Sequence, residues 1–313
     1  MLIINKRRMP LGIINKMKKY ISFDIGGTSI KYGVLNENGE IIIKDSMDSE
    51  ARIHGGRGIV KKIIEKSNFY KEKYDLKGVA ISSHGMIDSE NGVVLFADEH
   101  LIPNFSGMKV KEIVEKETLL ACEIENDVNS AGLGELWMSD NISSQFVSMV
   151  TVGTGIGSCL IKDGLLLTGN SMCAGEIGKI TIPGGRFEDI SSSYAMTKKL
   201  EEKLNKKEGS ITGKIVFEEI EKGNQIAIDA VDEMIHNLAI GLSNLCFIYN
   251  PGVLILGGGI MSRSDYFESR LKTEMKKYLP DVIYNSTEIK FAKLRNDAGI
   301  IGALRNFLNK HQD

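Results

Sequence analysis

The sequence is poor in cysteine, has no excess of charge of either sign and contains no long hydrophobic run. Only four of its 313 residues are cysteines, and none forms a CxxC or CxC pair, which excludes a zinc ribbon and a redox dithiol. Lys and Arg number 39 against 41 Asp and Glu, a net charge of −2, whereas nucleic-acid binders normally carry a basic excess. No apolar run approaches the roughly 20 residues that span a bilayer. We therefore expect no nucleic-acid partner, no membrane contact and a cytoplasmic protein with reduced cysteines.

The amino-terminal segment is basic but lacks the continuous apolar stretch of a signal peptide. Met9 and Met17 offer alternative starts, and we expect residues 1–16 to form an extension outside the folded core. A short amphipathic membrane anchor is the alternative interpretation of this segment. At roughly 150 residues per domain, the length of the chain favours about two domains.

The folded part of the chain is expected to begin with three strands. Residues 20–24 and 29–35 are separated by a Gly-Gly-Thr turn, and residues 40–46 follow a two-residue hairpin turn, Asn38-Gly39. This is followed by an alternation of helices and buried strands, which is typical of an α/β fold with mixed sheets. Apolar spacing predicts helices over 58–67, 109–117 and 128–137, and strands over 78–85 and 121–127.

The pattern of strand, Gly/Thr-rich turn, strand, tight turn and strand returns roughly 130 residues later. Residues 146–153 form an apolar strand, and residues 158–167 contain a strand, a Lys-Asp-Gly turn and a further strand. This internal repeat predicts two halves built on one plan, with a ligand in the cleft between them. The rest of the second half is expected to be mostly helical, with helices over 226–248, 266–278 and 299–308 and a buried strand over 252–258.

The first glycine turn follows the first expected strand in the run Asp24-Ile25-Gly26-Gly27-Thr28. Backbone N–H groups can approach an anion where side chains are absent, so this turn is a candidate phosphate site. It is neither a P-loop nor a dinucleotide fingerprint, because both require a helix directly after the turn. The phosphate would lie on a β-hairpin turn, with the Thr28 hydroxyl as a donor, and Asp24 could hold Mg²⁺ through water. A hairpin without a ligand is the alternative.

Two further glycine runs occur in the second half of the chain. The turn Gly153-Thr154-Gly155-Ile156-Gly157 repeats the Gly/Thr chemistry at the matching place. Two such turns facing each other across a cleft would bind a polyphosphate from both sides. Residues 257–259 are all glycine, follow a buried strand and precede a helix. They would permit close approach of a flat base or a sugar.

Carboxylates near these turns are candidates for acid–base chemistry and sugar binding. Asp127 lies where a strand gives way to a helix and could accept the proton of a substrate hydroxyl. Its alternative role is to cap the helix over 128–137. Glu176 and Glu188 lie in polar loops and suit the hydroxyls of a sugar, with solvated loop carboxylates as the alternative. His84 has no ligand-like spacing and is interpreted as an ordinary residue.

These motifs together resemble the ROK sugar kinases, a family within the actin/hexokinase/Hsp70 ATPase superfamily. The resemblance extends from Tyr20 to Leu304 and implies two actin/hexokinase-like (ribonuclease H-like) α/β domains with a cleft between them. It places residues 17–126 plus 298–313 in the smaller domain and residues 127–297 in the larger one. The matching segments, in family order, are FDIGGTSIKYGVL, ISSHGMID, IPNFSG, IENDVNSAGLGE, VTVGTGIGS, AGEIG, IYNPGVLILGGGI and NDAGIIGA.

The resemblance also implies a role for each matching residue, with ATP and Mg²⁺ as cofactors, a small-molecule sugar as partner and a homodimer as the assembly. Asp127 matches the catalytic base. The positions that match ATP or phosphate contacts are Asp24, Gly26, Gly27, Thr28, Lys31, Gly153, Thr154, Gly155, Gly157, Gly257, Gly258 and Gly259. The positions that match sugar contacts are Gly85, Asn104, Asn126, Asp127, Glu176 and Glu188.

One departure from the family pattern concerns zinc. Zinc-containing members have a histidine at the position of Lys179, followed by a cysteine cluster, whereas residues 180–193 contain no cysteine here. The resemblance therefore implies no zinc site and the loss of the sugar contact that this histidine makes. The zinc-free branch includes bacterial N-acetylmannosamine kinases and β-glucoside kinases. We expect ATP-dependent phosphorylation of the 6-hydroxyl of a hexose, with N-acetylmannosamine first and a β-glucoside kinase or a glucokinase as the alternative.

Two non-enzymatic classes within the same family are not expected. A transcriptional repressor would carry a winged helix-turn-helix domain ahead of the first glycine turn, and only 23 residues precede Asp24. A sugar sensor without activity would be expected to lose the base or a phosphate motif. The chain retains both, and this favours an enzyme.

Overall fold

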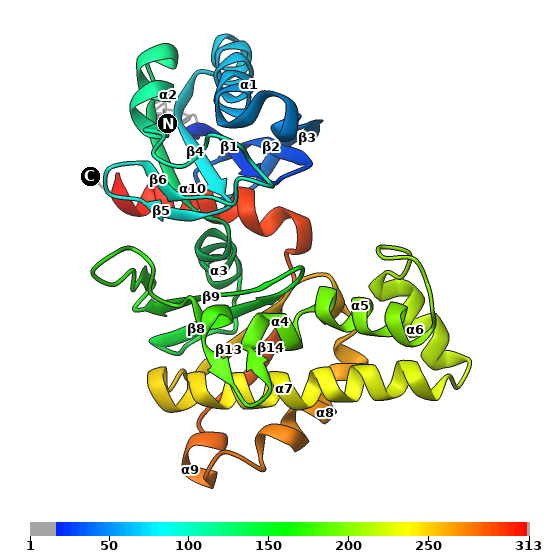
Figure 1. Cartoon of the computed structure of the whole chain (residues 1–313). Coiled ribbons are helices and arrows are strands. Elements are labelled where there is room, and N and C mark those ends of the chain that lie inside the picture. The colour runs from blue at the N-terminus through cyan, green and yellow to red at the C-terminus, as the bar shows by residue number, and fades with distance from the viewer. Residues whose placement is uncertain (1–16, 312–313) are drawn as a thin grey trace, which may run out of the picture.

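A computed structural model describes residues 17–311, which fold into two halves, each built on a five-stranded sheet (Figure 1). The mixed α/β class expected from the sequence is confirmed. The predictions for residues 1–16 lie outside the described residues. Among residues 17–311, no helix has the length and apolar character needed to cross a membrane.

The first sheet has an antiparallel part and a parallel part. Its strands are β1 (Lys19–Ile25), β2 (Ser29–Asn36), β3 (Ile41–Asp48), β4 (Leu76–Ser83) and β7 (Ala121–Asn126), in the order β3-β2-β1-β4-β7. β1 pairs antiparallel with β2 and parallel with β4, which pairs parallel with β7. The predicted hairpin between β2 and β3 is present, but it is not closed by a two-residue Asn38-Gly39 turn. The Gly39 N–H donates to the Asn36 carbonyl at 2.9 Å, so the turn is centred on Glu37 and Asn38, and Gly39 follows it with a φ of +82°.

The second sheet repeats the plan of the first. Its strands are β8 (Phe146–Val152), β9 (Ile156–Lys162), β10 (Leu165–Leu166), β13 (Val253–Gly257) and β14 (Glu288–Phe291), in the order β10-β9-β8-β13-β14. As in the first sheet, three antiparallel strands are followed by two parallel ones. The internal repeat predicted from the sequence is therefore confirmed as a repeated topology.

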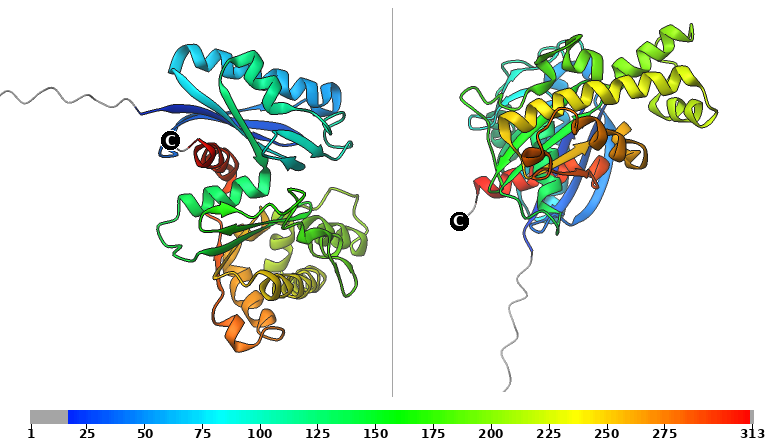
Figure 2. Two further views of the ribbon diagram at one scale, coloured as in Figure 1. Left: turned by 90° about the vertical axis from the view of Figure 1, so that its left-hand side faces the viewer. Right: turned by 90° about the horizontal axis from the view of Figure 1, so that it is seen from below.

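Helices separate the two sheets and cover their outer faces. α1 (Ala51–Tyr74) and α2 (Val110–Thr118) pack on the outer face of the first sheet, and α3 (Asp127–Trp137) and α10 (Ala298–Lys310) lie between the two sheets (Figure 2, left). The outer face of the second sheet packs mainly against α7 (Gln225–Tyr249). The other helices are α4 (Phe187–Ser191), α5 (Ser193–Lys203), α6 (Gly213–Glu221), α8 (Ser264–Met275) and α9 (Asp281–Tyr284), with 3-10 turns η1 (Ile177–Lys179), η2 (Ile260–Ser262) and η3 (Arg295–Asp297).

Some elements differ from the sequence-based expectation. The helix predicted over 58–67 is too short, because α1 continues through a kink at Gly55, where φ is 58° and ψ is −161°. Directly after the kink, Gly56 allows close contact with Phe105, since a Cβ there would lie 2.5 Å from the Phe105 ring. The edge strand β14 was not predicted, nor were the hairpins β5 (Met86–Asp88) with β6 (Val93–Phe96) and β11 (Thr181–Ile182) with β12 (Gly185–Arg186).

Candidate active site

The strand register of the first sheet gathers the candidate residues at one edge. Across the parallel strands, Asp24 pairs with Ser82 and Ser82 with Glu125. The next row brings Ser83 level with Asn126. The first glycine turn, the segment after β4 and the start of α3 therefore meet where these three strands end, which is the usual place for a ligand on a parallel sheet.

Asp127 is the first residue of α3, and the helix is capped by its neighbour. The Asn126 Oδ1 accepts hydrogen bonds from the N–H groups of Val128 and Asn129 at 2.9 and 3.1 Å. The alternative that Asp127 is the N-cap is therefore wrong. Because Asn126 serves as the cap, the half-buried Asp127 carboxylate is available at the helix N-terminus, where it also accepts from the Val128 N–H at 2.9 Å.

The surroundings of Asp127 adjust its acidity. Desolvation by burial raises the pKa of its carboxyl to about 6, and the negative charge of Asp24 acts in the same direction. The positive charge of His84 opposes this rise in the pKa of Asp127. At neutral pH the carboxylate is ionised and more basic than that of an ordinary aspartate, a range that suits a general base.

His84 belongs to this cluster, although its sequence interpretation was that of an ordinary residue. It directly follows β4, one position beyond the Ser83–Asn126 pair, so its place beside Asp127 continues the register. Its charge also acts on Glu176 in the other half of the molecule. The strand pattern could have suggested that His84 lies near Asp127. Its proximity to Glu176 is visible only in the three-dimensional structure.

Asp24 lies between the first glycine turn and the start of α10. Its Oδ1 accepts a hydrogen bond from the Ser82 Oγ at 2.8 Å, and its Oδ2 lies 3.5 Å from the Lys31 Nζ. A Cβ added to Gly299 would lie 2.5 Å from the Asp24 Cγ, so the first turn of α10 packs directly on this carboxylate. The positive end of that helix favours a negative group here. The side chain of Asp24 remains 20% exposed, and its carboxylate can accept a further ligand.

The first two glycine turns have related geometry. Gly26 donates its N–H to the Ser29 carbonyl at 3.0 Å, and Gly153 donates to the Gly155 carbonyl at 2.9 Å. The threonines at their tips, Thr28 and Thr154, are exposed. Both turns therefore offer an accessible hydroxyl beside a closely turned backbone. The predicted residue Gly157 lies inside β9 instead, where a Cβ would come within 2.5 Å of Val128 on α3.

The third glycine run lies beside the second turn. β13 pairs in parallel with β8, with Gly257 level with Thr151. Gly258 has a φ of +98°, and a Cβ there would come within 2.2 Å of the Val152 carbonyl oxygen. Glycine is therefore required at this position. Gly259 has no atom near its Cβ position and faces open space.

The predicted sugar residues of the second half form an ion-paired group. The Glu188 Oε1 lies 2.6 Å from the Lys179 Nζ, and the Glu188 side chain is only 15% exposed. Glu176 lies half-buried just before η1; burial raises the pKa of its carboxyl, while the positive charge of Lys179 opposes the rise. Neither glutamate is the freely solvated loop residue of the alternative interpretation.

Two of the remaining predicted sugar residues lie at the end of β4, and the third lies in the loop before α2. The Asn126 Nδ2 donates to the Gly85 carbonyl at 2.8 Å, and Gly85 has a φ of +110°. Asn104 also has a positive φ, of 54°, and its N–H donates to the Glu99 carboxylate at 2.9 Å. Its loop reaches the first glycine turn, since a Cβ on Gly27 would contact the Leu101 side chain at 3.5 Å.

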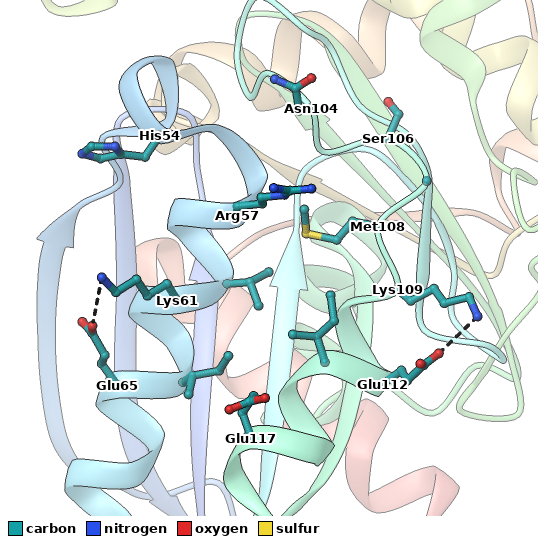
Figure 3. Close-up of a pocket in the computed structure, with 14 residues that line it drawn as sticks. His54, Arg57, Lys61, Glu65, Asn104, Ser106, Met108, Lys109, Glu112 and Glu117 are labelled. Atoms are coloured by element: carbon teal, nitrogen blue, oxygen red, sulfur yellow. Dashed lines mark ion pairs between the residues drawn. The ribbon is translucent and has the colours of Figure 1, made fainter.

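A broad groove of about 1210 Å³ lies between α1 and α2 (Figure 3). Of the predicted site residues, Asn104 alone is among those that line it. The groove therefore lies beside the candidate site and does not contain it. Its walls carry both acidic and basic groups, including His54, Arg57, Lys61 and Glu112.

The described part of the chain contains no cluster of side chains of the kind that holds zinc. Among residues 17–311, no group of three or more His, Cys, Asp or Glu side chains is placed to hold a metal ion. The expected independence from zinc remains a prediction.

Comparison with known proteins finds similarity along nearly the whole chain. The model described as the ROK family matches residues 20–310. An uncharacterized protein of Clostridium perfringens is 40% identical over 291 residues, which cover 93% of this chain and 98% of that protein. A β-glucoside kinase of Listeria innocua is 30% identical, with 94% and 100% covered. The structure of a Listeria monocytogenes protein suggested to be an N-acetylmannosamine kinase has a TM-score of 0.82 and 29% identity, with 94% and 100% covered.

Proposed function

The chain belongs to the ROK family, and we propose that it is an ATP-dependent kinase that phosphorylates the 6-hydroxyl of a hexose. The observation that carries this proposal is the position of Asp127, at the edge where the first glycine turn also lies. The sequence relatives of the chain include a glucokinase and a β-glucoside kinase. Its actin/hexokinase-like fold is shared with the Listeria monocytogenes protein of similar structure. The retention of every phosphate motif favours an enzyme over a sugar sensor without activity.

Asp127 is proposed as the general base. Its pKa of about 6 leaves it ionised at neutral pH, so it can orient the 6-hydroxyl and accept its proton as the oxygen attacks the γ-phosphorus of ATP. The Asn126 side chain holds the start of α3 to Gly85 and so fixes the carboxylate relative to the sugar. Closure of the two halves would exclude water, which competes with the sugar as acceptor.

The glycine turns are proposed to bind the phosphates of ATP. The first and second turns would each present backbone amides and a threonine hydroxyl to the polyphosphate. The run over 257–259 would then lie against the adenosine, because Gly259 leaves open space beside it. Asp24 fits a Mg²⁺ ion held through water, since its carboxylate is partly exposed at the first turn. When bound, Mg²⁺ neutralises charge on the phosphates.

Among substrates we propose N-acetylmannosamine first and β-glucosides second. The Listeria monocytogenes protein of similar structure supports the first, and the Listeria innocua β-glucoside kinase supports the second. Lys179 stands in place of the family histidine and its ammonium pairs with Glu188, so the imidazole contact with the sugar is lost. A homodimeric assembly and a cytoplasmic location are likewise proposed on family grounds alone.

A coupled assay of ADP release tests the proposal against N-acetylmannosamine, N-acetylglucosamine, glucose, mannose and cellobiose. We expect the highest kcat/KM with N-acetylmannosamine, because specificity is this ratio. If cellobiose is used at least tenfold more efficiently, the choice of sugar is wrong and the kinase proposal stands. Release of ADP with none of the sugars would overturn the kinase proposal for these substrates.

A further inference from the structure

Lys179 places an ammonium group among the carboxylates of the candidate sugar site. Its Nζ lies 2.6 Å from the Glu188 Oε1, and its side chain is 53% exposed. Its charge also acts on the half-buried Glu176. Lys179 therefore contacts one residue proposed to bind the sugar and is close enough to a second to act on its charge, with part of its side chain open to solvent.

Glu188 is anchored by the backbone and can hold this ammonium in place. Its Oε2 lies 2.8 Å from the position that a Cβ on Gly155 would occupy and 3.0 Å from that of Gly178. The same oxygen lies 3.5 Å from the Ile156 N–H. One carboxylate oxygen thus rests against the second glycine turn, while the other pairs with Lys179. An ammonium has three donors, and this geometry uses one of them for Glu188.

The chemistry of the site is otherwise rich in acceptors. The carboxylate oxygens of Asp127, Glu176 and Glu188 accept hydrogen bonds, which suits sugar hydroxyls because a hydroxyl can donate. The carbonyl of an acetamido group can only accept, so it needs a donor from the protein. A charged donor makes a stronger hydrogen bond than a neutral one.

We propose that Lys179 is a specificity-determining residue that donates to the acetamido carbonyl of an N-acetylated sugar. This inference rests on the proposed function, because it assigns the substrate class of the same site. Glu188 sets the position of the ammonium, and the exposed part of Lys179 faces the substituent. A sugar with a hydroxyl in place of the acetamido group gains less from this contact.

The test compares sugars that differ in the C2 substituent alone: N-acetylmannosamine with mannose, and N-acetylglucosamine with glucose. Lys179→Met removes the donor and keeps the length of the side chain, whereas Lys179→Arg keeps a charged donor. Lys199→Met is the matched control, since Lys199 pairs with Glu233 on the surface. We expect the methionine variant to lower the acetylated-to-unacetylated ratio of kcat/KM at least tenfold, mainly by raising KM for the acetylated sugar. The arginine variant should keep part of the preference for the acetylated sugar. The control variant should keep the wild-type ratio of kcat/KM.

Two results would overturn the role of Lys179. One is an equal loss with both sugars of a pair, which would mean that Lys179 only neutralises Glu188. The other is a wild-type protein that prefers the unacetylated sugar of both pairs. If no sugar is phosphorylated, the kinase proposal fails, and titration calorimetry with the same sugars still measures the ratio of Kd values. An unchanged ratio in Lys179→Met then rejects the specificity proposal independently.

Discussion

At the residue scale, Asp127 is the side chain on which the proposed chemistry depends most. Asp127→Asn keeps the size of the side chain and its ability to hydrogen bond to a sugar, but removes the base. Loss of a general base typically costs about 10²–10⁴ in rate, so kcat should fall by that factor. Sugar binding, measured by calorimetry, should persist. A variant with near-normal kcat would show that Asp127 is not the base.

The acidity of Asp127 gives a prediction for the pH dependence of kcat. Burial raises its pKa to about 6, so the base is protonated and inactive below that pH and ionised above it. We expect kcat to rise as the pH increases through about 6 and then to level off. The positive charge of His84 lowers the pKa of Asp127, and His84→Asn should therefore move the acid limb to higher pH.

The pH–rate profiles of three proteins test this. His236→Asn is the control, because His236 lies on α7 in the other half of the molecule, where its ring contacts Glu274. Its profile should match that of the wild type. An acid limb that stays in place in His84→Asn, or moves to lower pH, would contradict the proposed influence of His84.

Residues of the site differ in how far the sequence alone could identify them. Asp127 and the glycine turns were predictable, because each directly follows a recognisable strand. The pair of Lys179 with Glu188 joins η1 to α4, and only the folded chain shows that the lysine reaches the carboxylate. His84 was missed because spacing between histidines carries no information about its neighbours across the sheet.

At the scale of elements, the contact of α3 with α10 is the closest helix packing that the glycines reveal. A Cβ on Gly302 would lie 1.5 Å from the Ser130 carbonyl oxygen, and a Cβ on Gly134 would lie 2.8 Å from that of Ala298. The two helix backbones are therefore in direct contact, because the glycines have no side chain to hold them apart. Since these helices lie between the sheets, their spacing also sets the separation of the two halves (Figure 2).

Gly302→Ala should therefore destabilise the protein. Alanine favours a helix over glycine by about 1 kcal/mol, but here the methyl group meets a backbone carbonyl that cannot move alone. Overpacking typically costs about 1–3 kcal/mol, and we expect the clash to prevail in the free energy of unfolding, measured with urea. Gly213→Ala is the control, because the nearest atom to its Cβ position lies 4.0 Å away. Equal stability of the two variants would contradict this packing argument.

The elements themselves were predictable where apolar spacing was regular. β8, α7 and β13 were expected close to their observed limits, since each is buried along a clear period. The start of α1 was not, because its kink at Gly55 depends on contact with the Pro103 carbonyl, which lies in a distant loop. The short edge strand β14 likewise becomes a strand only by pairing with β13.

At the scale of the whole molecule, the two halves are joined by two chain crossings that lie together. One leads from β7 into α3, and the other leads from β14 into α10. Glu135 on α3 links them, since its carboxylate accepts the backbone N–H groups of Lys293 and Leu294 at 3.0 and 2.7 Å. Adjacent crossings allow one half to rotate against the other about a single axis, which is the motion that closure over a sugar requires.

The size of the two cores leads to the last prediction, which concerns metal. Each half has its own large cluster of buried apolar side chains, so we expect folding not to depend on a metal ion, unlike that of small zinc domains. Chelation with EDTA should therefore leave the Tm unchanged while it abolishes kinase activity, because Mg²⁺ is removed from the nucleotide. Adding Mg²⁺ alone should restore full activity, and metal analysis should find no stoichiometric zinc. Zinc at one ion per chain, or activity that returns only with zinc, would show that the loop around Lys179 holds a metal after all.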